Sequence, residues 1–567
     1  MNANFSTIDY LVFIIYAITI VGIGLFVSRK KKGKEQTAES YFLASKSLPW
    51  WAVGASLIAA NISAEQMIGM SGSGFAIGLA IASYEWMAAL TLIIVGKFFL
   101  PVFIKQGIYT IPGFLEKRFG KTIKSILAVF WISLFVLVNL TSVLYLGALV
   151  IDTILGVGDG SLVITAIIGL ALFTAIYSLW GGLAAVAWTD VLQVFLLVLG
   201  GLLTAFIALD HVAPEGGILN GFAYIYHEVP GKFSMIVDKG EIMMPNGKDA
   251  WWDLPGLAVL IGGMWVANLY YWGFNQYIIQ RTLAAKSLKE SQKGIIFAGF
   301  LKLIIPLIVV VPGIIAYVLN MDASGVVTNA SAHASFISDT GGIMPDKAYP
   351  WLVDKFVPIG LKGLVLAALA AAIVSSLASM LNSTATIFTM DLYKAHFHPE
   401  ASEKKLVSVG RLTALIALII AGVIAPLLGS LEQAFQYIQE YTGIVSPGIL
   451  AIFILGLYWP KTTNKAAIWG AALAVPVALF FKVGSKAWMN GTSLESIFPN
   501  LPWMDQMGYT FIIVSLIIMA ISYFDGNGKV NPKGIQLNKG YFETTKGYNT
   551  GAIIIIIILV FLYSFFW

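Results

Sequence analysis

Long apolar segments follow one another along the whole chain, separated by short polar stretches. A helix that crosses a bilayer needs about 20 mainly apolar residues, because the hydrocarbon core is about 30 Å thick. Most of the segments have about this length, so the pattern predicts a bundle of membrane-spanning helices. We expect fourteen of them, near residues 9–28, 51–75, 79–103, 126–151, 162–178, 188–209, 255–277, 294–319, 361–390, 411–428, 433–458, 466–482, 508–524 and 549–567.

Composition agrees with a membrane protein and removes several other classes. Of the 567 residues, 58% are hydrophobic and 11% are charged, a balance that would not keep a soluble protein of this size in solution. The chain has no cysteine, which excludes disulfides, thiolate metal sites and cysteine nucleophiles. The predicted fold class is an all-α polytopic membrane protein with a single transmembrane domain over residues 1–567.

The distribution of basic residues predicts the orientation in the membrane. Lysine and arginine lie in short runs between apolar segments, so the net charge of +5 reports topology and not a nucleic-acid partner. The first apolar segment has no basic residue before it and five within 29–34 after it, which is the reverse of a secretory signal. We expect this segment to be retained, both termini to lie outside, and the loops 210–253 and 320–360 to be extracellular.

Two of the expected spans are interrupted by polar residues in a related way. One opens at Trp50 and Trp51 and is broken at 61–66; the other opens at Trp251 and Trp252 and is polar at 268–275. They cross the membrane in opposite directions, which is the pattern of an inverted-repeat transporter with its substrate at the midplane. We expect two five-helix repeats over 51–209 and 255–458, with peripheral helices at 9–28, 466–482, 508–524 and 549–567.

Polar side chains within several of the expected spans form a candidate substrate site. An ionisable group inside a membrane is costly and marks function by default. A sugar needs amide and carboxylate partners for its hydroxyls and a flat ring for its apolar face, and Tyr271 supplies such a ring. The hydrogen-bonding groups would be Asn61, Gln66, Glu85, Asn268 and Gln439.

Several of these residues also have a simpler interpretation. Glu85 lies near the outer end of its helix and could face an aqueous vestibule, and Lys302 could extend to the cytoplasmic interface. Ser63 and Gln66 have the spacing of a capping box at the start of a helix. A cap and a binding role are compatible, because both require the helix to break there.

A run of small hydroxylated residues offers oxygen ligands for sodium. Ser375, Ser379, Asn382, Ser383 and Thr386 share one face of a helix. Such a face either packs closely against another helix or, with unwound backbone carbonyls, coordinates a hard cation. Asp190 with Gln193 also has two interpretations: the pair fits a helix N-cap or a way-station for a cation near the inner mouth.

The five histidines are scattered and no nucleophile has a base at a suggestive spacing, so we expect no enzyme.

Long stretches of this sequence resemble the solute:sodium symporter family. They are SLPWWAVGASLIAANISAEQ (47–66), YSLWGGLAAVAWTDVLQV (177–194), WVANLYYWGFNQYIIQRTLAAKS (265–287), AALAAAIVSSLASMLNSTATIFTMD (367–391) and FQYIQEYTG (435–443). The resemblance implies a LeuT-type core of two inverted five-helix repeats in a bacterial inner membrane. It also implies that a sodium gradient drives uptake of a sugar such as galactose or glucose, with Na⁺ as the coupling ion.

Residue roles follow from the same resemblance, motif by motif. The implied sugar ligands are Gln66, Glu85, Asn268, Lys302 and Gln439, with Asn61 beside them. The implied gates are Tyr271 with Trp272 on the inner side and Met70, Tyr84 and Phe435 on the outer side. The implied sodium ligands are the carbonyls of Ala59, Ile62 and Ala372 and the hydroxyls of Ser375 and Ser376, with Asp190 on the inner exit path. One residue departs from the family pattern: Ala88 cannot donate the hydroxyl expected of a galactose-binding member.

Other functions are compatible with the residues alone. The chain could carry another neutral polar solute with sodium, or couple transport to protons through Glu85. It could also be a membrane sugar sensor or a passive channel, either of which would bind sugar without accumulating it. Only one sodium site is readable, which favours one ion per sugar.

Overall fold

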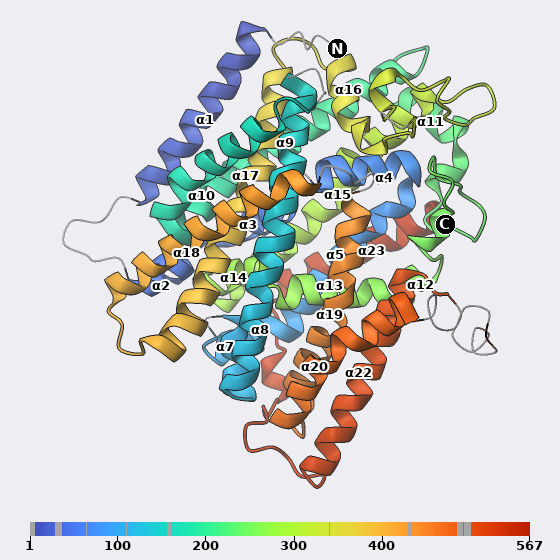
Figure 1. Ribbon diagram of the computed structural model, residues 1–567. Coiled ribbons are helices and arrows are strands. Elements are labelled where there is room, and N and C mark those ends of the chain that lie inside the picture. Colours follow the sequence, from blue (N-terminus) through green and yellow to red (C-terminus); the bar gives the residue numbers. More distant parts are fainter. Residues whose placement is uncertain are drawn as a thin grey trace.

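Helices account for the regular structure of the computed structural model (Figure 1). The structure describes residues 6–28, 37–63, 65–108, 110–155, 160–338, 341–428, 434–484, 492 and 500–567. These ranges contain no β-strand, only the isolated bridges Leu48 with Ala285, Met243 with Asp249 and Ile337 with Ile343. The expectation of an all-α protein is therefore confirmed for the described residues.

Eleven helical stretches in the described part of the chain are long and apolar enough to cross a membrane. They are Thr7–Val27, Leu79–Lys105, Lys121–Asp152, Gly182–Val212, Leu288–Asn320, Lys362–Phe397, Glu403–Leu428, Ile438–Tyr458, Asn464–Val483, Trp503–Asp525 and Lys546–Phe565. The main helices within and between them are α1 (Thr7–Ser28), α5 (Ser83–Ile94), α6 (Leu100–Lys105), α7 (Ile111–Arg118), α8 (Lys121–Leu134), α9 (Thr141–Leu155), α15 (Leu288–Asn320), α16 (Ala348–Phe356), α17 (Lys362–Thr386), α18 (Glu403–Ile424), α19 (Ala434–Tyr458), α20 (Asn464–Leu479), α22 (Trp503–Asp525) and α23 (Lys546–Phe565).

The other three expected spans, 51–75, 162–178 and 255–277, are helical but short or broken. Residues 163–176 form an apolar helical stretch at the start of α10 (Val163–Val212), which turns sharply at Gly182. Gly182 has φ +58°, and a Cβ there would lie 2.3 Å from the Tyr41 carbonyl oxygen, so only glycine fits. A count by length therefore gives eleven, and the count of fourteen stays a prediction.

The first polar interruption ends a helix as the sequence indicated. Helix α3 (Trp50–Asn61) stops at Ile62, whose backbone is extended, and a π-helical turn (Glu65–Met70) leads into α4 (Ser71–Ala76). The Ser63 N–H donates to Gln66 Oε1 at 3.0 Å, which is one half of the predicted capping box. The Ser63 hydroxyl oxygen instead accepts the Glu65 N–H at 3.1 Å. The break thus has its own hydrogen bonds.

The second interruption separates short helices in the other half of the chain. Helices α12 (Ala258–Ile261) and α13 (Gly263–Phe274) meet at Gly262, and α13 is separated from α14 (Gln276–Leu283) by Asn275, whose backbone is extended. Both interrupted segments border the same internal pocket. This is the placement that the sequence pattern predicts for a transporter with a binding site between its broken helices.

Burial distinguishes central helices from exposed ones. In the stretch Lys362–Phe397, which contains α17, 94% of an apolar 18-residue segment is buried. Helix α17 packs on α10, α3 and α9. The expected peripheral helices are the reverse: 17% of such a segment is buried in α1 and 28% in α20, α22 and α23. However, α18 is also only 28% buried although it belongs to an expected repeat. Exposure alone does not separate repeats from periphery, and that division stays a prediction.

Candidate substrate and sodium sites

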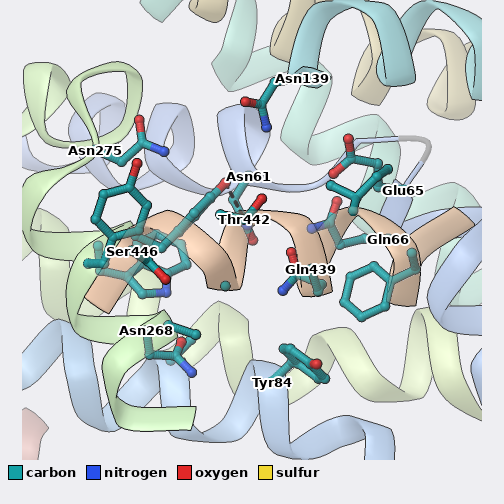
Figure 2. A pocket seen from close by; sticks show the side chains of 18 of the residues that line it. Asn61, Glu65, Gln66, Tyr84, Asn139, Asn268, Asn275, Gln439, Thr442 and Ser446 are labelled. Atoms are coloured by element: carbon teal, nitrogen blue, oxygen red, sulfur yellow. Dashed lines mark hydrogen bonds between the residues drawn. The ribbon is translucent and has the colours of Figure 1, made fainter. Parts of the chain in front are cut away.

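One internal pocket brings together all the predicted substrate residues (Figure 2). They come from α3, the π-helical turn after it, α5, α13, α15 and α19, which lie far apart in the sequence. The residues are Asn61, Gln66, Glu85, Asn268, Tyr271, Trp272, Lys302 and Gln439. The lining mixes amides, a carboxylate, an ammonium and aromatic rings, and Ala88 is also part of it. No residue of this set lies elsewhere.

Lys302 does not extend to the membrane interface, so that interpretation is wrong. It is fully buried near the middle of α15, and its Nζ donates to the carboxylate of Glu85 and to Asn61 Oδ1. The same Nζ lies 5.0 Å from the centre of the Trp272 ring. Glu85 is 3% exposed, which makes the pair a buried ion pair within the pocket wall. The pocket therefore gains hydrogen-bonding groups from this pair at no net charge.

Tyr271 joins two elements at one side of the pocket. Its hydroxyl oxygen accepts hydrogen bonds from Asn61 Nδ2 at 3.1 Å and from the Tyr277 hydroxyl at 2.8 Å. Its ring stands at 77° to the neighbouring ring of Trp272, with 5.2 Å between the centres. The hydroxyl thus fixes the ring between the end of α3 and the start of α14. Such a ring offers a flat apolar face to a ligand.

The hydrogen bonds within the wall limit what each amide offers a ligand. Gln66 Oε1 accepts from both the N–H and the hydroxyl of Ser63 at 3.0 Å, so its remaining group is the Nε2 donor. Asn268 Nδ2 donates to the Met264 carbonyl at 3.2 Å, which leaves its second N–H and its Oδ1 acceptor. Gln66 therefore offers hydroxyls a donor, whereas Asn268 offers both a donor and an acceptor.

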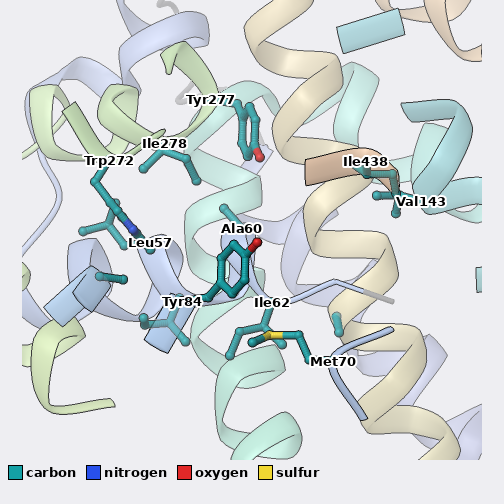
Figure 3. Packing of buried hydrophobic residues seen from close by; sticks show 14 of the residues in the cluster. Leu57, Ala60, Ile62, Met70, Tyr84, Val143, Trp272, Tyr277, Ile278 and Ile438 are labelled. Carbon is teal, nitrogen blue, oxygen red and sulfur yellow. The ribbon is translucent and has the colours of Figure 1, made fainter. Parts of the chain in front are cut away.

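The predicted outer gate residues separate into two positions. Tyr84 and Phe435 line the pocket and contact each other edge to face, with 5.1 Å between ring centres. Met70 does not line it; Figure 3 shows Met70 within the buried apolar packing that also holds Ile62 and Tyr84. Contact with the pocket thus holds for the two aromatic rings and not for Met70. The gating role of all three stays a prediction.

Other polar residues of the pocket were not among the predicted substrate ligands. Some of them had a signal: Thr442 and Ser446 follow Gln439 by three and seven residues on α19, which places them on the same helical face (Figure 2). Asn275 and Tyr277 lie beside the second break, and Glu65 lies within the first. Asn139 had a weaker one, a single amide in an apolar helical segment. The missed polar lining residues are Glu65, Asn139, Tyr270, Asn275, Tyr277, Thr442 and Ser446.

The predicted sodium ligands lie on α17 and at the broken end of α3, and these two helices pack against each other. The Ser376 hydroxyl donates to the Ala60 carbonyl at 3.2 Å, and both residues are buried. In a continuous helix the Ser63 N–H would bond the Ala59 carbonyl, but it donates to Gln66 instead. No cluster of three or more acidic, histidine or cysteine side chains that could hold a metal exists among the described residues.

Asp190 does not cap a helix, so the N-cap interpretation is wrong. The turn in α10 comes eight residues earlier, at Gly182, so Asp190 lies inside the helix and not at its start. Its side chain is fully buried. Its carboxylate accepts hydrogen bonds from Ser56 at 2.5 Å and from Ser375 at 2.6 Å, and it lies 4.0 Å from the Arg281 guanidinium. The aspartate is therefore directly connected to one predicted sodium ligand, Ser375.

Three other residues of the predicted polar face of α17, Ser379, Ser383 and Thr386, bond a neighbouring helix. Arg281 and Gln280 of α14 bond this face: Arg281 donates to Ser379, and Gln280 bonds Ser383 at 2.8 Å and Thr386 at 3.1 Å. The packing interpretation is thus correct for these three residues, whereas the side-chain amide of Asn382 has no hydrogen-bond partner. Nearer the start of α17, Ser376 bonds α3 through the Ala60 carbonyl, and Ser375 bonds Asp190 of α10.

Comparison with known proteins identifies the family. The model of the Sodium:solute symporter family matches residues 41–473, which is more than half of the chain. The chain belongs to the Sodium:solute symporter family. Among the members of known name, the sodium/glucose cotransporter of Vibrio parahaemolyticus is 57% identical over 562 residues, covering 99% of this chain and 98% of that protein. The human sodium/myo-inositol cotransporter 2 is 34% identical over 82% of this chain and 68% of its own length.

A solved structure shares the fold of this symporter. The Na⁺-coupled sialic acid symporter, in its substrate-bound outward-open state, superposes with a TM-score of 0.75 and 22% identity, covering 92% of this chain and 98% of that one. Family membership and the eleven apolar helices make the chain a multi-pass membrane transporter.

Proposed function

We propose that this symporter couples inward flow of sodium to uptake of a sugar by alternating access. The observation that carries the proposal is the single pocket that joins a neutralised Glu85–Lys302 pair, several amides and the Tyr271 ring. A neutral molecule with many hydroxyls suits these groups, since the pocket holds donors and acceptors on several sides. The full-length likeness to a sodium/glucose cotransporter supports the same substrate class.

Galactose or glucose is the substrate that we propose. The two sugars differ in the direction of one hydroxyl, so hydrogen bonds in the wall decide between them, not the size of the pocket. Ala88 lines the pocket three residues after Glu85 and offers no hydroxyl there. A cyclic polyol is a second candidate, because a relative at 34% identity is named for myo-inositol. Competition by a panel of hexoses, deoxy sugars and inositol distinguishes these substrates.

The sodium site that we propose lies at the broken end of α3. Its ligands are the carbonyls of Ala59, Ile62 and Ala372 and the hydroxyls of Ser375 and Ser376. In support, Ser376 already contacts the Ala60 carbonyl. The α3 break also forms part of the sugar pocket through Asn61 and Gln66. An ion that orders the break would therefore order two sugar ligands, which is a direct route for coupling. Asp190, bonded to Ser375, would receive the ion on its way to the cytoplasm.

The proposed architecture concerns the number of helices, their repeats and their orientation in the membrane. Fourteen helices, two inverted five-helix repeats over 51–209 and 255–458, and both termini outside a bacterial inner membrane agree with the broken segments and the charge pattern. The pocket would open alternately past Tyr84 and Phe435 on one side and past Tyr271 on the other.

Equilibrium binding of labelled glucose and galactose to the purified protein, in sodium and in potassium, tests the sodium site. Removing one of about five oxygens leaves the ion under-coordinated. Ser376→Ala should therefore need much more sodium for the same sugar binding and should melt like wild type. Thr384→Ala is the matched control, because Thr384 is a buried hydroxyl of the same helix that bonds only the carbonyl one turn earlier. Unchanged sodium dependence in S376A would refute the site.

A further inference from the structure

An apolar groove lies between the C-terminal helix α23 and helices α5 and α15, which stand beside it in Figure 1. Every residue that lines it is apolar. The lining includes Trp86 of α5, Leu303 and Leu307 of α15, and Phe561 and Phe565 of α23. None of these residues belongs to the substrate pocket or to the predicted sodium site.

The groove extends from the loop side of the molecule toward the middle of the membrane. Along α15 it runs from Leu303 to Val311, which is about 12 Å at 1.5 Å per residue. One end is formed by Phe222 of α11 (Ile218–Glu228) and Phe233 of the next short helix, both in the long loop 210–253. At the other end the Trp86 indole N–H donates to the Leu303 carbonyl at 3.4 Å, so the polar groups there are paired.

The groove is continuous with the surface that faces lipid. Phe561 and Phe565 of its rim are 64% and 58% exposed. Along the same helix, Ile553, Ile557 and Val560 are similarly exposed. Because α23 is an apolar membrane-spanning stretch, the medium beside these side chains is the hydrocarbon of the bilayer.

We propose that this groove binds one acyl chain of a bilayer phospholipid. An apolar cavity does not hold water well, since water needs two or more polar partners. An unfilled groove would also lose dispersion contacts along its whole lining. At this depth of the membrane the acyl chain is the component that fills the space with matching chemistry and enters sideways from the surrounding bilayer. The headgroup would then lie near α11.

Photo-crosslinking in proteoliposomes tests the site with the full chain. The probe is a phosphatidylcholine that carries a diazirine on one acyl chain, and the readout is a peptide map of the labelled protein. We expect labelling of 303–311 and 561–566 to be several-fold denser than labelling of the exposed apolar face of α1. Equal density on α1 would overturn the proposal, because the groove would then see only ordinary surrounding lipid.

A matched pair of variants separates the groove from its surroundings. Leu307→Trp places a large side chain in the groove, whereas Ile304→Trp places one on the exposed face of the same helix, outside the lining. L307W should lose most of the dense labelling and I304W should keep it. Equal labelling in the two variants would contradict the site. If L307W does not fold, the wild-type map decides alone.

Discussion

Glu85 and Lys302 are the pair of residues whose removal should be felt most strongly. Taking away one member of a buried ion pair leaves an uncompensated charge and typically costs about 3 to 5 kcal/mol. Lys302→Met should therefore lower both the melting temperature and the sugar affinity. The double variant Glu85→Gln with Lys302→Met removes both charges and should recover much of the melting temperature but not the affinity. A melting temperature equally low in the double variant would mean that the pair is not coupled as the contacts indicate.

Tyr271 combines a ring and a hydroxyl whose contributions can be separated. Tyr271→Phe keeps the ring but loses the hydrogen bonds with Asn61 and Tyr277, at about 0.5 to 1.5 kcal/mol each. It should keep much of the sugar binding, whereas Tyr271→Ala, which removes the apolar face, should abolish it. Titration of labelled sugar at fixed sodium measures both variants. Equal loss in the two would assign the role to the hydroxyl and not to stacking.

The sequence predicts which residues meet better than it predicts what each one bonds. The polar substrate residues stood out because amides and charges are costly inside apolar segments, and they do line one pocket. The ion pair between Glu85 and Lys302 was not predictable, since it joins helices separated by more than two hundred residues. Asn139 and Met70 are two residues whose position relative to the pocket the sequence did not predict. Asn139 lines the pocket although it is an isolated amide, whereas Met70 carries a family signal but packs in the apolar core outside the pocket.

At the scale of helices, polar interruptions were reliable guides to breaks, because an orphaned backbone needs replacement partners. The Ser63–Gln66 spacing predicted the break after α3 and half of its hydrogen bonds. Asp190 failed as a cap because the preceding turn depends on Gly182, and that turn is fixed by close approach to Tyr41, a tertiary contact. Expected boundaries were correct where local chemistry sets them and wrong where packing does.

Lys232 connects the long loop 210–253 to the end of α4 and should make stability depend on pH. Its Nζ donates to the carbonyls of Phe75 and Ala76 at 3.1 and 2.7 Å, and burial lowers the pKa of its ammonium group to about 7. A neutral amine still has two N–H groups, so both bonds survive deprotonation. Between about pH 7 and 10 the unfolded chain binds this proton and the folded chain does not, so the free energy of unfolding rises with pH.

Melting curves from pH 7 to 10 test that prediction. The melting temperature of wild type relative to Lys232→Met should increase across the range, because methionine has no proton to lose. Lys239→Met is the control, since Lys239 lies in the same loop, and its difference from wild type should stay flat. A constant difference between wild type and K232M would show that Lys232 keeps its charge in the folded protein.

At the scale of the whole molecule, the fold class was predictable because lipid allows few alternatives. A chain with this composition must satisfy its backbone within helices, and the charge pattern then orders them. The number of spans is harder, because three of the expected spans are short or broken. Spans 51–75 and 255–277 are interrupted beside residues that line the pocket, so neither contains one helix of ordinary membrane length.

Sodium-coupled symport uses the energy stored in a sodium gradient to accumulate sugar. Proteoliposomes that contain the purified protein and a low internal sodium concentration measure this directly, with labelled glucose and galactose outside. On addition of external sodium, internal sugar should rise transiently above the external concentration, and a proton ionophore should not prevent it. Without the gradient, sugar should only equilibrate. Sugar that never exceeds the external concentration would indicate a channel or a sensor, and accumulation that needs a proton gradient instead would transfer the coupling role to Glu85.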